Sequence, residues 1–263
     1  MGDLAVLRSR LRDLDRVVVA FSGGADSAFL AWVAHDELGP DRASSVTAVS
    51  PSLAPEEEGE CRALAEEWGL RWLPVLTDEL ANPAYGVNDG ERCYHCKAEL
   101  RDVVGPVALD AGATVVLGVN VDDLGDHRPG QRAAAERGAA FPLVDAGFTK
   151  DDVRAASRAL GLRTWDKPAA ACLASRVPYG TPVTLSVLRE VAAAESGLRA
   201  LGFRQLRVRH YGDLARIEVP VDELAAVLAQ REAVVAAVRA AGYRYVTLDL
   251  EGFRSGNLNA ALS

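Results

Sequence analysis

The sequence predicts an α/β protein, with a doubly wound parallel sheet followed by a smaller C-terminal α/β domain. Short apolar runs typical of strands buried on both faces alternate with longer segments whose apolar residues recur at helical spacing. The pattern changes after residue 184, where two strand-like segments are separated by only three residues, Tyr-Gly-Asp. We therefore expect a first domain over 1–165, a linking loop over 166–184 and a second domain over 185–263.

The first domain contains four strand-like segments, at 16–21, 45–50, 71–76 and 113–119. Four helical segments follow them in turn, at 26–37, 55–69, 94–110 and 149–160. Pro74 lies within the third strand and cannot donate to a sheet ladder, which places that strand near an edge. Thr149 and Asp152 have the spacing of a capping box at the start of the last helix.

The second domain is expected to run helix, strand, strand, helix, strand, at 185–200, 204–210, 214–219, 221–241 and 244–249. Between the two domains, the segment 161–184 is rich in Pro, Gly and small residues and has no regular period. We interpret it as a functional loop that leads into the second domain.

The composition indicates a soluble protein without a nucleic-acid-wrapping surface. The 263 residues carry a formal net charge of −8, with a pI near 5.1, whereas non-specific nucleic-acid binding needs a basic surface. We expect no secretory leader, because the first residues lack a long apolar run, and we find no myristoylation pattern and no apolar stretch of the roughly 20 residues that span a membrane. Four cysteines in such a chain are typical of a reducing compartment, so we expect a cytoplasmic protein.

A Gly-rich loop links the first strand to the first helix of that sheet, and it reads Ser22-Gly23-Gly24-Ala25-Asp26-Ser27. It lacks the Gly-Lys-Ser/Thr of a P-loop and the spacing of GxGxxG. Adjacent glycines let backbone N–H groups form an anion nest, and the helix that follows adds its dipole. Ser22 and Ser27 can donate to phosphate oxygens, and Asp26 suits Mg²⁺. The alternative is a tight turn in which Asp26 or Ser27 caps the helix.

This loop resembles the SGGXDS signature of the PP-loop ATP pyrophosphatases, which cleave ATP to AMP and pyrophosphate while adenylylating an acceptor. The resemblance implies an adenine nucleotide alpha hydrolase-like domain that binds ATP and Mg²⁺ through Ser22, Gly23, Gly24, Asp26 and Ser27.

Four further segments resemble the LarE family of ATP-dependent sulfur transferases, which make the pincer-type nickel nucleotide cofactor. They are GVNVDDLGDHRPG (118–130), GFTKDDVR (147–154), WDKPAAACLASRVPYG (165–180) and RVRHYGDLARIEV (207–219). The resemblance implies that ATP adenylylates a carboxylate of a pyridinium biscarboxylate mononucleotide and that the carboxylate ends as a thiocarboxylate.

The nucleophile that this resemblance implies is Cys172, which without it would be read as a small core residue among alanines. A nearby cation would favour its thiolate, and Arg176 or Lys167 could supply that charge. Arg207 and Arg209 alternate along one strand and so face the same side.

The family further implies a phosphate site made of Ser175, Arg176, Arg207 and Arg209, with Asp26 and Arg176 joining Cys172 in catalysis. The alternative for the two strand arginines is a solvated face with ion pairs to Glu218 or Asp213. Metal or ribose binding and simple helix capping both remain open for three further acids, Asp122, Asp123 and Asp126.

Cys93 and Cys96 form a CxxC pair. Such a pair alone can supply half of the ligands of a zinc site, or it can close as a redox disulfide. With Cys172 they give three thiolates, and some members of the family hold a [4Fe–4S] cluster on such a set. Other members sacrifice the sulfur of the reactive cysteine itself, and this route stays open. We expect His95 to be structural and Cys61 to be a buried core residue.

The expected partner is a small-molecule nucleotide, with no membrane and no stable nucleic-acid binding. We also expect a homo-oligomer, with a hexamer among the assemblies considered and with oligomer contacts in the 185–263 domain. Three rival functions remain: a PP-loop tRNA thiolase, an ammonia-using synthetase and a non-catalytic nucleotide-binding module.

Overall fold

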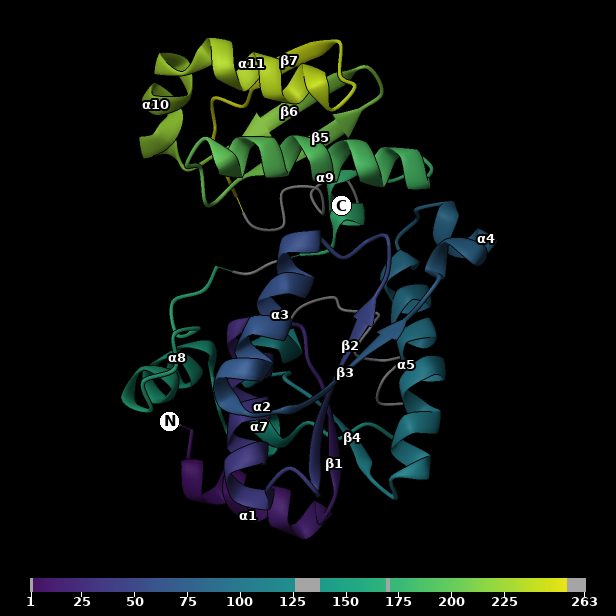
Figure 1. Ribbon diagram of the computed structural model, residues 1–263, viewed down its shortest axis with the longest axis vertical. Coiled ribbons are helices and arrows are strands. Elements are labelled where there is room, and N and C mark those ends of the chain that lie inside the picture. Colours follow the sequence, from purple (N-terminus) through teal and green to yellow (C-terminus); the bar gives the residue numbers. More distant parts are fainter. Residues whose placement is uncertain (1, 126–137, 169–170, 255–263) are drawn as a thin grey trace. The chain divides into compact units, whose positions relative to one another are not determined.

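The computed structural model describes residues 2–125, 138–168 and 171–254 (Figure 1). Contacts divide the chain into two compact units that are discontinuous in sequence. The first unit comprises 1–50, 56–79 and 93–170, and the second comprises 51–55, 80–92 and 171–263.

The first unit is built on a parallel sheet of four strands in the order β3-β2-β1-β4. Their bounds are Val17–Ala20 (β1), Ala43–Val49 (β2), Arg71–Leu76 (β3) and Thr114–Leu117 (β4). This confirms the predicted parallel α/β sheet. β3 is an edge strand, as Pro74 indicated, since Pro74 can lie only where no ladder bond is needed from its nitrogen.

Helices cover both faces of this sheet, so it is doubly wound. The helices of the unit are α1 (Leu4–Leu14), α2 (Ala25–Leu38), α3 (Pro55–Trp68), α5 (Arg92–Asp110), α7 (Pro142–Asp145) and α8 (Lys150–Ala159). Val17 and Val19 pack in one apolar core with α1, α2, α3, α7 and α8, whereas Val18 packs against α5 on the other face. The alternation follows from the period of two along a strand. The unit also contains the 3-10 turn η2 (Val121–Gly125), and a second 3-10 turn, η1 (Glu79–Ala81), lies where the chain passes into the second unit.

The strand order places the carboxyl ends of β1 and β4 side by side, and the order of strands reverses between them. β1 leads through α2 to β2 on one side, and β4 lies on its other side. In open α/β sheets such a switch point is where ligands bind. The Gly-rich loop that begins after Ala20 and the segment that begins at Gly118 both lie there.

The second unit contains a three-stranded sheet in the order β5-β6-β7. β5 (Arg207–Tyr211) and β6 (Leu214–Glu218) form the predicted antiparallel hairpin, and β7 (Tyr245–Leu248) pairs parallel to β6. The helix α9 (Leu185–Ala200) packs against β5, and one apolar core joins residues of α9, the sheet and the C-terminal helices. α4 (Pro83–Gly86) and the 3-10 helix η3 (Leu173–Arg176) also belong to this unit.

The prediction of a single helix over 221–241 is wrong. The segment forms a 3-10 turn η4 (Val221–Glu223) and two helices, α10 (Leu224–Ala229) and α11 (Arg231–Ala240). The break falls at Gln230, whose φ of −102° and ψ of 19° lie outside the helical region. No helix within the described residues is long and apolar enough to span a membrane.

Candidate functional site

The loop that follows β1 has the backbone geometry of an anion-binding turn. Gly23 has a φ of 68°, a left-handed conformation that glycine adopts without steric cost. Gly24 is the N-cap residue of α2, and as a glycine it has no side chain that could cap the first turn of that helix. The start of α2 therefore presents backbone N–H groups and the positive end of the helix dipole at the carboxyl edge of the sheet.

The two serines of this loop contact each other. The Oγ atoms of Ser22 and Ser27 lie 3.0 Å apart, and the backbone N–H of Ser22 donates to the Ser27 hydroxyl over 3.2 Å. The Ser27 hydroxyl in turn donates to the carbonyl of Gly24. Ser22 is exposed and Ser27 is buried. Ser27 thus closes the loop, while Ser22 is the hydroxyl that faces solvent.

Gly118 lets the segment after β4 approach this loop. A Cβ at residue 118 would lie 2.8 Å from the backbone nitrogen of Ser27 and 2.9 Å from its Cα, closer than real side chains come. Glycine is therefore required where the two loops of the switch point meet.

Three polar side chains gather near the carboxylate of Asp26. Nδ2 of Asn120 donates to Oδ1 of Asp26 over 3.2 Å, and the backbone N–H of Asn120 donates to Asp123. Nζ of Lys150 lies 3.1 Å from Oδ1 of Asp123. Asn120 is fully buried, and its Oδ1 has no hydrogen-bond partner among the described residues. The cluster is thus rich in the oxygen donors that Mg²⁺ prefers.

Burial raises the pKa of Asp26 above its ordinary value. The hydrogen bond from Asn120 opposes this shift, the charge of Asp123 adds to it, and the charges of Lys150 and Arg154 reduce it. A bound cation would favour the ionised carboxylate.

Of the three acidic residues predicted in the loop after β4, the two that the structure describes make different contacts. Asp122 accepts the backbone N–H of Lys150 over 2.8 Å and so caps the start of α8, which is the capping alternative. Asp123 belongs to the cluster around Asp26, and Asp126 lies outside the described residues. The capping box of Thr149 and Asp152 is confirmed.

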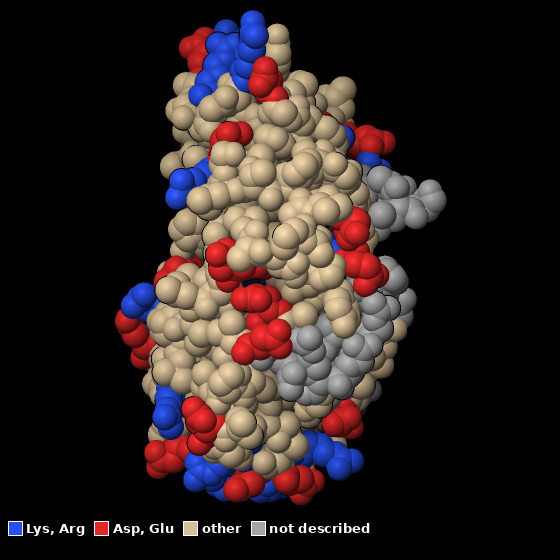
Figure 2. All heavy atoms as spheres, turned by 90° about the vertical axis from the view of Figure 1, so that its right-hand side faces the viewer, with Lys and Arg blue, Asp and Glu red and all other residues tan. Residues whose placement is uncertain are grey.

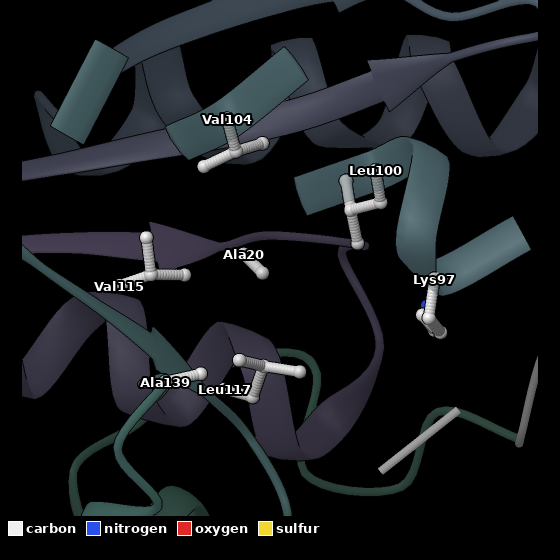
Figure 3. A pocket seen from close by; sticks show the side chains of 7 residues that line it. All are labelled: Ala20, Lys97, Leu100, Val104, Val115, Leu117 and Ala139. Carbon is white, nitrogen blue, oxygen red and sulfur yellow. The ribbon is translucent and has the colours of Figure 1, made fainter. Parts of the chain in front are cut away.

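An apolar pocket opens at the same strand ends, on the face of the sheet that α5 covers. In Figure 3 side chains from β1, β4 and α5 point into it, and Lys97 stands at one side. It is lined by Ala20, Lys97, Leu100, Val104, Val115, Leu117 and Ala139.

In the second unit, Cys172 is exposed at the N-cap of η3. The backbone N–H of the next residue, Leu173, donates to the carbonyl of Ser52 over 2.8 Å, and the carbonyl of Cys172 accepts from the backbone N–H of Ser175. Leu173 and Ala174 are buried. The thiol therefore stands at the surface on a loop whose next two residues are anchored in the core.

Arg176 holds the backbone around this thiol. Its Nε and Nη2 donate to the two carboxylate oxygens of Glu195 over 2.7 and 2.9 Å. Its Nη1 donates to the carbonyls of Ala171 and Cys172 and to the hydroxyl of Ser175. Arg176 is 2% exposed. The guanidinium predicted near Cys172 is thus present, and it binds the loop itself. Lys167, the other predicted cation, belongs to the first unit and pairs with Glu57.

The two arginines of β5 differ in their contacts. Arg209 donates twice to Glu218, over 2.8 and 3.0 Å, and once to the carbonyl of Ser175 over 2.8 Å. The ion pair that was the alternative reading therefore exists for Arg209, and it is buried. Arg207 lies over the ring of Phe253. Burial lowers the pKa of Arg207 to about 10, and neighbouring arginines add to this effect.

These contacts belong to a cluster in which cations outnumber anions. Arg199 pairs with Glu195, and Arg216 pairs with Glu218 and Asp249. The cluster has five arginines and three carboxylates: Arg176, Arg199, Arg207, Arg209, Arg216, Glu195, Glu218 and Asp249. Among these described residues the arginines outnumber the carboxylates by two, which suits a phosphate group.

The remaining cysteines lie in the first unit. Cys93 and Cys96 are the second and fifth residues of α5, one helical turn apart, and Cys93 is exposed. All four cysteines of the chain are thiols. Within the described part of the chain, no three His, Cys, Asp or Glu side chains gather into a metal site. A cluster on Cys93, Cys96 and Cys172 therefore stays a prediction.

Cys61 is fully buried, as predicted. A Cβ at Gly23 would lie 3.0 Å from its sulfur, so the thiol packs beneath the Gly-rich loop. Burial raises the pKa of Cys61 to about 11, against the effect of a hydrogen bond with Thr47. This makes it a packing residue.

Sequence reasoning missed Asn120, Lys150 and Glu195 as site residues. Asn120 and Lys150 lie within the segments GVNVDDLGDHRPG and GFTKDDVR, which resemble the family. The resemblance therefore marked their neighbourhood, but it assigned no role to either residue. Figure 2 shows both acidic and basic side chains on the face of the molecule that it draws.

Comparisons with known proteins place the whole chain among three similar proteins. It is 47% identical over 260 residues to an uncharacterised protein of Synechocystis sp., covering 98% of this chain and 97% of that one. It is 40% identical over 260 residues to pyridinium-3,5-bisthiocarboxylic acid mononucleotide synthase of Lactiplantibacillus plantarum, covering 98% and 94%. An uncharacterised protein of Methanocaldococcus jannaschii is 25% identical over 241 residues, covering 91% of each chain. No family model matches the chain.

Proposed function

The chain belongs to the LarE family, and from this premise we propose that it is an ATP-dependent sulfurtransferase of nickel-pincer nucleotide cofactor synthesis. Its substrate would be a pyridinium biscarboxylate mononucleotide, one carboxylate of which becomes a thiocarboxylate. The observation that carries the proposal is the exposed thiol of Cys172, on a loop that Arg176 fixes beside a cluster whose described arginines outnumber its described carboxylates.

The first step would be adenylylation. A carboxylate oxygen of the substrate attacks the α-phosphorus of ATP, the bond from that phosphorus to the β-phosphate oxygen breaks, and pyrophosphate leaves. The N–H groups of the Gly-rich loop and the hydroxyl of Ser22 would bind the leaving pyrophosphate.

Mg²⁺ fits the oxygen donors around Asp26. Bound there, it would neutralise charge on the phosphates. Asp26 would hold the ion, and Asn120 fixes the carboxylate of Asp26 through its hydrogen bond. Lys150, which lies beside Asp123, would contribute positive charge toward the phosphates.

The substrate phosphate would bind to the arginine cluster. Arg207 is the guanidinium there whose pKa is lowered by burial and by neighbouring cations, so an added anion would relieve that repulsion. Arg209 and Ser175, which are already joined by a hydrogen bond, would complete the phosphate site with Arg176.

The second step would transfer sulfur. The thiolate of Cys172 attacks the carbonyl carbon of the acyl adenylate, a thioester forms and AMP leaves. In the sacrificial route, loss of the Cα proton and cleavage of the Cβ–S bond release the thiocarboxylate and leave dehydroalanine at residue 172.

The alternative source of sulfur is a [4Fe–4S] cluster. Three cysteine thiols, Cys93, Cys96 and Cys172, are the donor type that such a cluster requires. When bound with three protein ligands, the cluster would offer one iron to an added sulfide. This would allow multiple turnovers, since no protein sulfur is consumed.

The deciding experiment uses the full chain, reconstituted anaerobically, with ATP, Mg²⁺ and the dicarboxylate nucleotide. Pyrophosphate release, product mass and protein mass are measured together. We expect a thiocarboxylate product, with Cys172→Ala retaining pyrophosphate release and losing the product. Loss of one H₂S equivalent at residue 172 supports the sacrificial route, and repeated turnover with added sulfide at constant protein mass supports the cluster.

Two outcomes would overturn the proposal. No pyrophosphate and no thiocarboxylate would exclude a sulfurtransferase, and ATP binding without turnover would favour a binding module. Thiolation of added tRNA in place of the nucleotide would identify the tRNA thiolase instead.

A further inference from the structure

We propose that a hollow beside α8, lined by Arg154, Arg158 and Trp165, binds a phosphate dianion. This hollow belongs to the first unit, whereas the arginine cluster that would take the substrate phosphate belongs to the second. The inference goes beyond the proposed function and does not depend on it, because no step of that reaction uses these three residues.

The hollow has the size of a small-ligand site and is open to solvent. Its volume is about 540 Å³, within the range of ligand pockets. Four of the residues that line it come from α8, and the fifth follows that helix: Arg154, Ala155, Arg158, Ala159 and Trp165. Two of the four helix residues are alanines, whose side chains end at Cβ and so leave room for a ligand.

The two arginines lie on one face of α8. They are four residues apart, and side chains at this spacing are neighbours on a helix. The guanidinium of Arg158 lies over the ring of Trp165, with Cζ 4.8 Å from the ring centre. The ring attracts the positive charge but offers no acceptor oxygen. Arg158 is therefore restricted in position while its N–H groups remain available to an anion.

Neither arginine forms an ion pair with an acid among the residues that the structure describes. The Nη2 of Arg154 donates to the backbone carbonyl of Lys167 over 3.4 Å, an acceptor without net charge. Asp151 and Asp166 are nearby acids in the sequence, but both are exposed, and neither pairs with Arg154 or Arg158 in the described part of the chain.

The other cations of this segment are paired. Lys150 lies beside Asp123, and Arg163 and Lys167 pair with glutamates of α3. Over the described residues from 150 to 168, the positive charge without an acidic partner is therefore at Arg154 and Arg158, and both line the hollow.

The charge and the donors of the hollow fit phosphate better than carboxylate. Two guanidinium groups carry two positive charges, and each can donate two parallel hydrogen bonds. A terminal phosphate group offers three oxygens and nearly two negative charges at neutral pH, whereas a carboxylate offers two oxygens and one charge. Trp165 adds an aromatic surface that the organic part of a phosphate monoester could contact. Free phosphate and a monoester share this chemistry, and the experiment separates them.

The test measures how fast phenylglyoxal modifies each arginine of the full chain, with peptide mass spectrometry to locate the products. Inorganic phosphate is compared with chloride at equal ionic strength. We expect phosphate to slow the modification of Arg154 and Arg158 by about threefold, the effect of a ligand at twice its Kd. Arg231, which is exposed and pairs only with the adjacent Glu232, is the internal control and should react at an unchanged rate. Equal rates in phosphate and chloride would overturn the proposal.

Two further ligands identify the source of the phosphate group. Stronger protection by AMP than by inorganic phosphate would support the site and identify a monoester that contacts Trp165. Equal protection by the two would support the site with the phosphate ion itself as the ligand. Protection by a glutamate-rich peptide, with none by either phosphate compound, would overturn the proposal in favour of an acidic protein partner.

Variants of the hollow show whether its residues act together. We expect Arg158→Gln to remove the protection of Arg154 by phosphate, and Trp165→Leu to weaken it, because the ring no longer restricts Arg158. Arg163→Gln is the matched control, since Arg163 follows the same helix but pairs with acids of α3. Full protection of Arg154 in Arg158→Gln would contradict a shared site.

Lys150→Ala separates the hollow from the cluster around Asp26. Lys150 lies one turn before Arg154 on α8 and contacts Asp123. Protection of Arg154 and Arg158 that persists in Lys150→Ala would support a separate site in the hollow. Protection that disappears in this variant would place the anion at the Asp123 end of the helix and would overturn the proposal.

Discussion

Glu195 binds Arg176 through both of its carboxylate oxygens, and the pair is almost completely removed from solvent. The same carboxylate accepts the backbone N–H of Val208, between the two arginines of β5, and a bond from Arg199. One carboxylate of α9 thus orients both the loop of Cys172 and the start of the strand that presents Arg207.

We expect Glu195→Gln to destabilise the protein by about 3 kcal/mol, because removing one partner of a buried pair leaves the other charge uncompensated. Urea unfolding measures this change. Glu251→Gln is the control, since its ion pair with Arg254 is exposed and should contribute less than about 1 kcal/mol. Equal stabilities for the two variants would contradict the structural role of Glu195.

The same pair predicts an acid dependence. Burial alone would raise the pKa of Glu195, but the hydrogen bonds and charges of Arg176, the N–H of Val208 and Arg199 outweigh it, and the pKa is lowered. A lowered pKa in the folded state stabilises the protein above the pKa of the unfolded state, about 4.3, and this contribution is lost as the pH falls through the folded value. The stability difference between wild type and Glu195→Gln should therefore shrink below about pH 4. A constant difference from pH 7 to pH 3 would refute it.

The sheet could be predicted from the sequence because each of its determinants is local. Apolar runs marked the buried strands, and Pro74 marked an edge. The break at Gln230 could not be predicted, since the helical pattern continues through it without Pro or Gly.

The candidate site was predictable only in part. The Gly-rich loop has its own sequence signature, but Glu195 looks like a surface acid in an Ala-rich helix. Its partners come from η3 and β5, and such pairings depend on tertiary structure.

Asp26→Asn should separate stability from activity. Burial raises the pKa of Asp26, because the ionised carboxylate is less favourable in the folded protein than in the unfolded chain. The ionised carboxylate therefore lowers the stability of the fold, and it does so in full only at pH values above the pKa of the folded state. We expect the variant to be more stable than the wild type at pH 7, with the gain vanishing below about pH 4, and to lose pyrophosphate release. Thermal melts at both pH values and a pyrophosphate assay measure these effects. An active variant would remove Asp26 from the Mg²⁺ site.

Lys150→Ala tests the cation beside Asp123. Its side chain is about half exposed, so the variant should retain stability to within about 1 kcal/mol. We expect the KM for ATP to rise about tenfold, which corresponds to the loss of one charge-assisted hydrogen bond. Arg10→Ala, on the exposed face of α1, is the control and should leave the KM unchanged. A KM for ATP that stays at the wild-type value in Lys150→Ala would exclude contact with the phosphates.

Gly118→Ala tests whether the two loops of the switch point must touch. The added methyl group would lie 2.8 Å from the backbone nitrogen of Ser27, which cannot move without distorting the first turn of α2. We expect a destabilisation of about 1–3 kcal/mol and weaker ATP binding, since the N–H groups of that turn would be displaced. Gly59→Ala is the matched control, because Gly59 lies within α3 with open space around its Cα.

The control should change stability in the opposite direction, by about 0.5–1 kcal/mol, because alanine is a better helix former than glycine. Calorimetry for ATP and urea unfolding for both variants provide the comparison. Wild-type ATP affinity in Gly118→Ala would mean that the geometry of the Gly-rich loop does not depend on the segment after β4. A loss of affinity confined to Gly118→Ala would locate the nucleotide at the ends of β1 and β4, the switch point at which open α/β sheets bind ligands.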